Sequence, residues 1–262
     1  MTNLAVISYL AMGDSFTEGV GDPDDAGGCR GWADRFAQRL AAHAPGTRYA
    51  NLAIRGKLLG QVAAEQVPAA IALRPDLVSL AAGGNDLLRP RADPDSLAAT
   101  FDDAVSQMRA AGSQVLLFTG FDPGTFPLLR MIRGKAAAYN MNLREIARRR
   151  DCLLVDLWTM TVLTDPLMWC EDRLHLAPEG HRRVALRVCE AVGVPVDADW
   201  REQPAGDLAA GPGARPVTGW LAARRQDARW ARAHAAPWVS RRLRGVSSGD
   251  GIEPKRPELH PY

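Results

Sequence analysis

A serine directly after the first apolar segment is the first residue of the chain whose type and place suit chemistry. The apolar run from Leu4 to Met12 predicts a short buried strand, Gly13 permits a sharp turn, and Ser15 follows. Open α/β folds place their sites at the C-terminal ends of such strands, where a serine hydroxyl can act as a nucleophile. A serine in a strand-to-helix turn can equally cap the helix, so this stretch alone leaves both interpretations open.

Acyl transfer by a serine also needs a base, a group that orients the base, and donors for the oxyanion. Of the five histidines, His175 follows the fifth predicted strand and precedes the last predicted helix, which places it on the same sheet edge as Ser15. Asp172 precedes it by three residues and is close enough to accept from the imidazole and hold its tautomer. His181 lies on an apolar helix face and is predicted to be packed. Alone, the Asp-x-x-His spacing also fits a capping aspartate beside a surface histidine.

The elements that would position these residues alternate along the chain. Apolar segments predict strands over residues 4–12, 48–54, 76–82, 114–119 and 152–157. Amphipathic segments predict helices over residues 32–40, 58–73, 94–111, 133–149 and 178–192. This alternation predicts a three-layer α/β/α fold of the flavodoxin type, with a five-stranded parallel sheet covered by helices on both faces. Polar clusters after the first, second and third strands would then converge at one sheet edge.

Four separate blocks, in this order, resemble the SGNH/GDSL hydrolase family over residues 5–192. The blocks are Gly13-Asp14-Ser15, Asn51-Leu52-Ala53-Ile54-Arg55-Gly56, Gly83-Gly84-Asn85-Asp86 and Asp172-Arg173-Leu174-His175. The resemblance implies Ser15 as nucleophile, His175 as base and Asp172 as its orienter. It also implies an oxyanion hole made by the backbone N–H groups of Ser15 and Gly56 and the side-chain amide of Asn85. The expected activity is that of a serine esterase that works through an acyl-enzyme, without a metal or other cofactor.

The loop after the fourth predicted strand carries apolar side chains that bear on substrate choice. Phe126, Leu128 and Leu129 are candidates for the wall of an acyl pocket, and they fit the core equally well. The family's substrates include short-chain and aryl esters, lysophospholipids, thioesters and acetylated sugars, so the acyl and alcohol specificity stays open. The alternative to an enzyme is a catalytically silent ligand-binding protein on the same fold. The complete set of nucleophile, base, orienter and oxyanion donors argues against that alternative.

The composition and the missing motifs disfavour several other classes. The chain has 262 residues, 47% of them hydrophobic and 24% charged, and its formal net charge of +2 is too balanced to indicate nucleic-acid binding. No apolar run approaches the ~18 residues that span a bilayer, and a secretory signal is not evident. Gly-x-Gly-x-x-Gly, Gly-Lys-Ser/Thr and His-Glu-x-x-His motifs are absent, and none of the predicted strands leads into the Gly-x-Ser-x-Gly elbow of α/β-hydrolases. We therefore expect a cytoplasmic protein that acts on a small-molecule ester.

Two further features concern cysteines and the C-terminal part. The four cysteines lack metal-binding spacing, and a bridge between Cys29 and Cys170 stays open. The composition changes near Val196, which predicts a hydrolase domain over 1–196 and an Arg-rich extension over 197–262. We expect a helix of this extension to pack its tryptophan face on the core, and the alternative is a helix that binds a membrane surface or a partner. Residues from Ser247 on are expected to form an irregular tail. The sequence does not indicate an oligomeric state.

Overall fold

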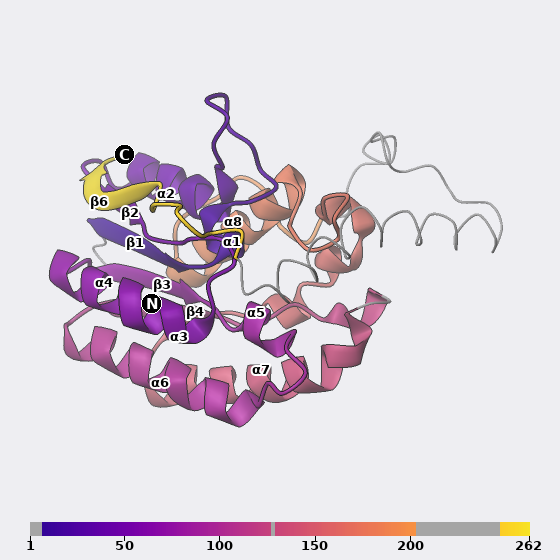
Figure 1. The fold of residues 1–262 in the computed structure, drawn as a ribbon. Coiled ribbons are helices and arrows are strands. Elements are labelled where there is room, and N and C mark those ends of the chain that lie inside the picture. Colours follow the sequence, from indigo (N-terminus) through magenta and orange to yellow (C-terminus); the bar gives the residue numbers. More distant parts are fainter. Residues whose placement is uncertain (1–6, 127–128, 203–246) are drawn as a thin grey trace.

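The structure is a computed structural model that describes residues 7–126, 129–202 and 247–262 (Figure 1). Its strands are β1 (Ser8–Gly13), β2 (Arg48–Asn51), β3 (Leu77–Ala81), β4 (Gln114–Phe118), β5 (Leu153–Val155) and β6 (Arg256–Pro261). Its α-helices are α1 (Ser15–Glu18), α2 (Gly31–His43), α3 (Leu59–Gln61), α4 (Val67–Leu73), α5 (Gly84–Leu87), α6 (Pro94–Ala110), α7 (Arg133–Arg149) and α8 (Pro178–Val192). Short turns are the π-helical η1 (Val62–Gln66) and the 3₁₀ turns η2 (Pro123–Thr125), η3 (Arg130–Ile132), η4 (Leu157–Thr159), η5 (Thr161–Thr164) and η6 (Pro166–Met168).

The strands form one sheet in the order β5-β4-β3-β1-β2-β6, and the first five strands of the chain run parallel. The predicted α/β fold and its parallel strands are confirmed, and the order β2-β1-β3-β4-β5 is the flavodoxin-like one. The chain moves from β1 to β2 on one side and then crosses to β3 on the other side of β1. The strand order therefore reverses at β1, and ligands of open α/β sheets bind outside the carboxyl ends of the strands at such a point.

The sixth strand comes from the C-terminal segment that the sequence pattern predicted to be irregular. β6 pairs antiparallel with β2 at the sheet edge, with Tyr49 opposite His260 and a register shift before Asn51. The prediction is wrong for these residues because β6 carries two prolines and polar side chains, which hide a strand in a sequence but are tolerated at an edge. The Arg-rich helix predicted upstream lies outside the described residues, and the domain boundary at residue 196 stays a prediction.

Two apolar cores cover the two faces of the sheet, and β1 contributes to both. Tyr9 and Ala11 belong to the core formed with α2 and α8, whereas Leu10 and Met12 belong to the core formed with α4, α6 and α7. This alternation follows from the period of two along a strand. Figure 1 shows the helices lying above and below the sheet in this way. Because both faces are packed, the strand ends that carry the site are held firmly.

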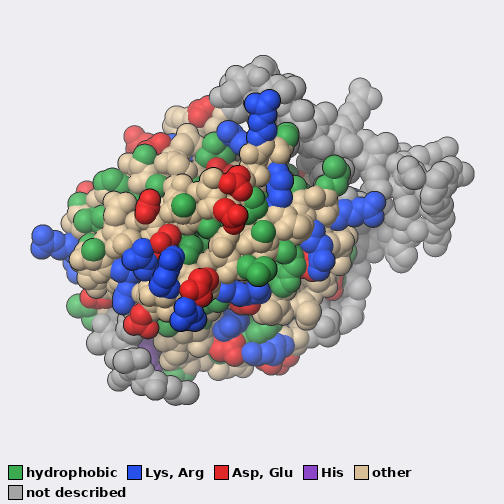
Figure 2. Space-filling model, turned by 90° about the horizontal axis from the view of Figure 1, so that it is seen from below, with side chains coloured by type: hydrophobic (Ala, Val, Ile, Leu, Met, Phe, Trp, Pro, Cys, Tyr) green, Lys and Arg blue, Asp and Glu red, His purple; other side chains and the backbone are tan. Residues whose placement is uncertain are grey.

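The surface over the lower helices is polar and carries both signs of charge. Figure 2 views the molecule from below Figure 1 and shows Lys and Arg side chains interspersed with Asp and Glu. Ion pairs join neighbouring helices here, and Arg150 of the α7 C-cap pairs with Asp102 of α6 at 2.8 Å. Such exposed pairs contribute about 0–1 kcal/mol each, so the apolar cores account for most of the stability.

Candidate active site

The turn after β1 places Ser15 at the C-terminal end of that strand, where the other parallel strands also end. Gly13 has φ +145°, and a Cβ at this position would collide with the carbonyl oxygen of Ala81 on β3, so only glycine fits. Asp14 is the N-cap of α1, because its Oδ1 accepts from the backbone N–H of Phe16 at 3.1 Å. Ser15 is therefore the first residue of α1 and not its cap, which resolves the question that the sequence left open. The Ser15 hydroxyl is therefore not the N-cap of α1.

Gln66 clamps this turn from the neighbouring layer, and the sequence analysis missed it. The backbone N–H of Gly13 donates to its Oε1 at 2.8 Å, and its Nε2 donates to the carbonyl oxygen of Gly13 at 2.9 Å. Gln66 ends the π-helical η1, which interrupts the helix predicted over 58–73. Pro68 follows at the start of α4 and lacks the N–H that a continuous α-helix would need there. No local pattern signals a contact between residues so far apart in the chain.

The loop after β2 carries Gly56, whose φ is +76° and which lines the cavity beside Ser15. Its predecessor Arg55 is fixed by the buried carboxylate of Glu18, which accepts from the Arg55 backbone N–H and, at 2.9 Å, from its Nε. Asn51 Oδ1 accepts from the N–H of the residue two places later at 3.0 Å and shapes the start of the loop. Glu18 is a second positioning residue that sequence reasoning missed, since 37 residues separate it from its partner.

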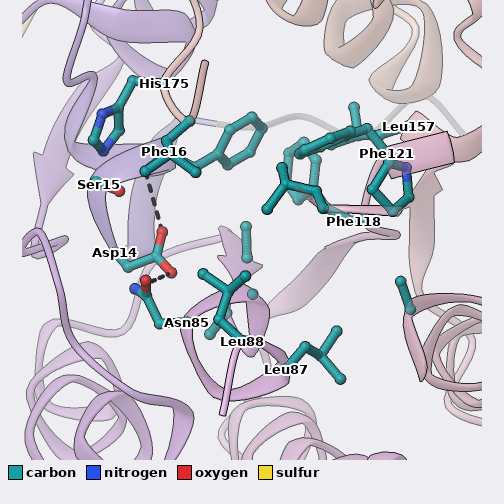
Figure 3. A pocket seen from close by; sticks show the side chains of 18 of the residues that line it. Asp14, Ser15, Phe16, Asn85, Leu87, Leu88, Phe118, Phe121, Leu157 and His175 are labelled. Carbon is teal, nitrogen blue, oxygen red and sulfur yellow. Dashed lines mark hydrogen bonds between the residues drawn. The ribbon is translucent and has the colours of Figure 1, made fainter. Parts of the chain in front are cut away.

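Asn85 reaches the cavity from the start of α5. Its Nδ2 donates to Asp14 Oδ2 at 3.1 Å (Figure 3). It also donates to the carbonyl oxygen of Lys57 at 3.1 Å. Asp86, which follows it, accepts from the backbone N–H of Leu59 at 3.0 Å and so ties α5 to α3. Both hydrogens of the Asn85 amide thus have protein acceptors in this structure. Donation to a bound oxyanion requires one of them to be shared or released.

Asp14 is the acceptor with which such an oxyanion would compete. Burial raises the pKa of Asp14 to about 6, and the N–H of Phe16 and the positive charge of His175 oppose that rise. A carboxyl with this pKa gives up its negative charge more readily than an ordinary aspartate. The side chain braces the turn, and its charge state bears on how firmly it holds Asn85.

A tight turn between η6 and α8 holds Asp172 and His175 together. Trp169 and Leu176 form an antiparallel bridge at its base. Within the turn Asp172 Oδ1 accepts from the backbone N–H groups of Leu174 at 2.9 Å and His175 at 3.0 Å. Its other oxygen, Oδ2, lies 2.6 Å from Nδ1 of the His175 ring. The aspartate therefore fixes both the loop and the orientation of the imidazole.

Electrostatics assign the tautomer of His175. Burial opposes ionisation of Asp172, but the hydrogen bonds and charge of His175 and the backbone N–H of Leu174 outweigh it and lower the pKa of Asp172 to about 2. The carboxylate is ionised at neutral pH and can only accept, so Nδ1 carries the proton. Nε2 is then the basic nitrogen. It makes no hydrogen bond to any other residue that the structure describes, and the ring lines the cavity.

The structure brings the predicted site residues from four loops to one edge of the sheet. Ser15, Gly56, Asn85 and His175 all line the same cavity, and Asp172 contacts His175 from behind. Figure 3 shows the imidazole of His175 beside Ser15, with Asn85 on the far side of Asp14. This is the convergence that parallel strand ends predict.

The cavity continues from these polar groups into an apolar chamber. Its volume is about 370 Å³. In Figure 3 Phe118, Phe121 and Leu157 lie on the other side of Phe16 from His175. The apolar lining residues are Phe16, Val20, Ala81, Ala82, Leu87, Leu88, Phe118, Phe121, Pro123, Leu129, Ile132, Ala136, Tyr139, Leu143, Leu157, Leu163, Trp169, Leu174 and Leu176. Many of them belong to the buried cores, so the chamber extends beneath the surface.

The three candidates for an acyl-pocket wall have different positions. Leu129 lines the chamber. Phe126 does not: it is buried behind the wall and packs against Phe121 and Trp169, with ring centroids 5.8 and 5.0 Å apart. It therefore supports two lining residues and is part of the core. Leu128 lies outside the described residues.

The described residues form neither a metal site nor a disulfide. In the parts of the chain that the structure describes, no group of three or more His, Cys, Asp and Glu side chains is placed to hold a metal ion. The four cysteines, all described, are free thiols, and so Cys29 and Cys170 are not bridged. Among the described helices, none is both long and apolar enough to cross a membrane.

A family model, the GDSL-like Lipase/Acylhydrolase family, matches residues 11–183. The chain belongs to this family. The matched region contains the turn of Ser15, the loops of Gly56 and Asn85, and the turn of Asp172 and His175. The protein is accordingly a hydrolase, and its family supports hydrolysis of carboxylic esters.

Solved structures similar to the chain include TesA, with 26% identity, a TM-score of 0.60 and coverage of 71% of this chain and 97% of that one. Axe2, an acetylxylan esterase from Geobacillus stearothermophilus, has 21% identity and a TM-score of 0.59 over 75% of this chain and 97% of its own. The psychrotrophic esterase EstA from Pseudoalteromonas sp., in a structure inhibited by monoethylphosphonate, has 15% identity and a TM-score of 0.59 over 71% and 97%. The last two show the fold alone. No curated protein matches the sequence.

Proposed function

We propose that this GDSL hydrolase is a serine esterase whose nucleophile, base and orienter are Ser15, His175 and Asp172. One observation carries the proposal. The ionised Asp172 holds Nδ1 of His175 at 2.6 Å, which leaves the basic Nε2 on a cavity that Ser15 also lines. A histidine held in this tautomer can take a proton from a serine hydroxyl and return it to a leaving group.

The reaction follows in two halves. Ser15 Oγ attacks the ester carbonyl carbon while His175 takes the hydroxyl proton, and Asp172 stabilises the imidazolium that forms. The tetrahedral intermediate expels the alcohol, which receives the proton from His175 and leaves an acyl-enzyme on Ser15. Water then attacks the acyl-enzyme with the same base, and the carboxylic acid departs.

The negative oxygen of each tetrahedral intermediate would be held by the backbone N–H groups of Ser15 and Gly56 and by the Asn85 amide. Each donor of this kind contributes about 3 kcal/mol to lowering the barrier. The Asn85 amide now donates to Asp14 and Lys57, so we expect its hydrogen bond to shift from one of them toward the oxyanion as charge develops. An oxyanion is a stronger acceptor than a backbone carbonyl, which favours this exchange.

The apolar chamber indicates the acyl group that the enzyme accepts. His175 must protonate the departing alcohol, so the alcohol lies on the His175 side of the scissile bond. The acyl chain then points to the opposite side of Ser15, where the lining is almost wholly apolar. A chamber of about 370 Å³ with this lining fits a fatty acyl chain, and an acetyl group would leave most of it empty.

A chain-length series tests the acyl assignment. Each methylene buried in the chamber should raise kcat/KM of p-nitrophenyl esters by up to about fourfold, from acetate until the chamber is full, since its burial contributes about 0.8 kcal/mol. Ala136 is a buried lining residue on α7, and Ala136→Leu should lower activity on the longer esters while sparing the acetate. Activity that is highest with acetate, or equal for all chains, contradicts the acyl assignment.

The nucleophile has its own test. Ser15→Ala should lower kcat to the background rate without changing the midpoint of thermal unfolding, because Asp14 and not Ser15 caps α1. A fluorophosphonate probe should label the wild type once per chain and leave the variant unlabelled, in line with the phosphonate inhibition described for EstA. A folded wild type that neither hydrolyses esters nor takes the label would point to a silent binding protein.

A further inference from the structure

The C-terminal segment Ser247–Pro261, here called the strap, lies outside the matched family region of residues 11–183. Its end forms β6 along β2, and Figure 1 shows its remainder continuing across the sheet edge to the neighbourhood of α1. β2 leads directly into the loop that carries Gly56. The strap therefore pairs with the strand that leads into the loop of Gly56, one of the proposed oxyanion donors.

A tight turn at the start of the strap packs on that loop. Gly249 is buried, and a Cβ on it would collide with the carbonyl oxygen of Arg55 and come within 2.8 Å of Ile54 Cγ2. Conversely, a Cβ on Gly56 would collide with Ser247 Oγ and lie 3.1 Å from Ser248 Oγ. The turn and the loop of Gly56 are thus packed closely on each other, and Ser248 itself lines the cavity.

The turn is internally braced. The backbone N–H of Gly249 donates to Ser247 Oγ at 3.2 Å, and the backbone N–H of Ser247 donates to Asp250 Oδ2 at 2.8 Å. The backbone N–H of Ile252 closes it by donating to the carbonyl oxygen of Gly249 at 3.1 Å. These hydrogen bonds define the conformation of the turn that packs on the loop of Gly56.

Lys255 anchors the strap to the end of α1. Its Nζ lies 2.7 Å from both the carbonyl oxygen of Glu18 and Asp34 Oδ2, and it also contacts the carbonyl oxygens of Cys29 and Arg30 at 2.8 and 2.9 Å. Glu18 is the residue whose carboxylate holds the Arg55 backbone. The strap and Glu18 therefore both contact the loop of Gly56, and Lys255 connects the strap to Glu18.

We propose that the strap is part of the active site and that its turn positions the backbone N–H of Gly56 toward the oxyanion. The inference rests on the proposed esterase function. The alternative is that the strap only covers the edge of β2, as edge strands need to be covered. Edge cover would affect the free energy of unfolding, whereas positioning affects the transition state more than the bound substrate.

The test compares two Gly→Ala variants in the full-length chain. Gly249→Ala puts a methyl group into the Arg55 carbonyl and should displace the loop, whereas Gly60→Ala on α3 meets no atom within 4 Å and is the matched control. With an octanoate ester, Gly249→Ala should lower kcat about 10- to 100-fold while KM stays within about twofold, because small misplacements near the reacting atoms have effects of this size. Gly60→Ala should match the wild type.

Inhibitors separate positioning from general damage. An alkylboronic acid forms a tetrahedral adduct with a serine nucleophile, so its Ki should rise by the same factor as kcat falls, while the Ki of octanoate, the product, stays unchanged. Ser247→Ala is the milder second variant, since it removes the hydroxyl that packs on Gly56 and accepts from the N–H of Gly249, and should lower kcat about 3- to 10-fold at constant KM. It keeps the test valid if Gly249→Ala does not fold.

The outcomes are distinct. If the wild type hydrolyses esters in a Ser15-dependent way but the folded strap variants retain its kcat and its boronic acid affinity, the positioning role is overturned and the esterase function stands. If the wild type shows no Ser15-dependent hydrolysis, the proposed function fails and the inference fails with it. A fall in kcat matched by weaker boronic acid binding, with unchanged octanoate binding, supports the positioning role.

Discussion

Two histidines six residues apart, His175 and His181, differ in exposure and in the hydrogen bonds of their ring nitrogens. His175 is partly exposed, uses Nδ1 to contact Asp172, and lines the cavity with Nε2 unbonded among the described residues. His181 is completely buried, accepts from the backbone N–H of Trp32 at Nδ1 and lies 3.2 Å from the carbonyl oxygen of Val20 at Nε2. Both nitrogens of His181 are therefore occupied, as its predicted packed position implies. One ring nitrogen left over for chemistry is what separates a base from a structural histidine.

Their neighbouring carboxylates differ in the same way. Asp172 is bonded by its own turn and by the imidazole, so its charge is directed at His175. Asp22 has its charge taken up by Arg35, with Nε at 2.7 Å, and it also accepts from the backbone N–H of Gly31. A carboxylate near a histidine is thus informative only when no arginine has already paired with it.

Substitution of each histidine in turn should give the largest difference in kcat between two variants. His175→Ala should lower kcat about 10⁴-fold or more, because the general base is lost, and should leave the fold intact. His181→Gln should keep kcat of the folded protein within about threefold and lower its stability. Kinetics with a p-nitrophenyl ester, with thermal unfolding run alongside, would decide this. Equal losses of kcat in both variants would mean that the two sites do not differ as described.

The carboxylates give the next contrast. Asp172→Asn should lower kcat about 10³- to 10⁴-fold, since an amide can donate to Nδ1 and favour the wrong tautomer. Asp22→Asn weakens the pairing with Arg35 far from the reacting atoms, so kcat per folded molecule should not change. Active-site titration with the phosphonate probe corrects for the folded fraction. A full-rate Asp172→Asn enzyme would remove Asp172 from the mechanism.

The smallest effect concerns the pH dependence of stability. Burial lowers the pKa of His181 to about 4, although the Val20 carbonyl and the charge of Asp22 oppose the shift. The unfolded chain protonates this histidine near 6.5, so the stability due to its neutral ring is complete above that pH and is lost as the pH falls through about 4. The loss amounts to roughly 3 kcal/mol.

Urea unfolding of the wild type and His181→Gln between pH 7.5 and 4 would measure this effect. The raised pKa of Asp14 acts in the opposite direction, with stability lost as the pH rises through about 6. It is present in both proteins, so it cancels in their difference. The stability advantage of the wild type should shrink as the pH falls, and an advantage independent of pH would contradict the buried neutral state of His181.

Much of the fold and the site was predictable because its signals are local. Apolar runs and helical periods predicted the five parallel strands and the helices between them. The polar blocks at the strand ends, together with their resemblance to the SGNH/GDSL family, predicted Ser15, Gly56, Asn85, Asp172 and His175 as neighbours. Gln66 and Glu18 were missed, since each holds a backbone group 53 or 37 residues away in the chain. No local sequence pattern predicts which distant backbone group each of these side chains contacts.

The sequence by itself determined the sheet, its helical layers and the residues gathered at its edge, because strand and helix periods and turn residues act over a few neighbours. Only the tertiary structure decided which partners the two nitrogens of His181 find and which acceptors hold the Asn85 amide. It alone also decided that the proline-containing strap adds β6 to the sheet and packs on the loop of Gly56. These outcomes depend on distances between groups far apart in the chain, and packing sets those distances.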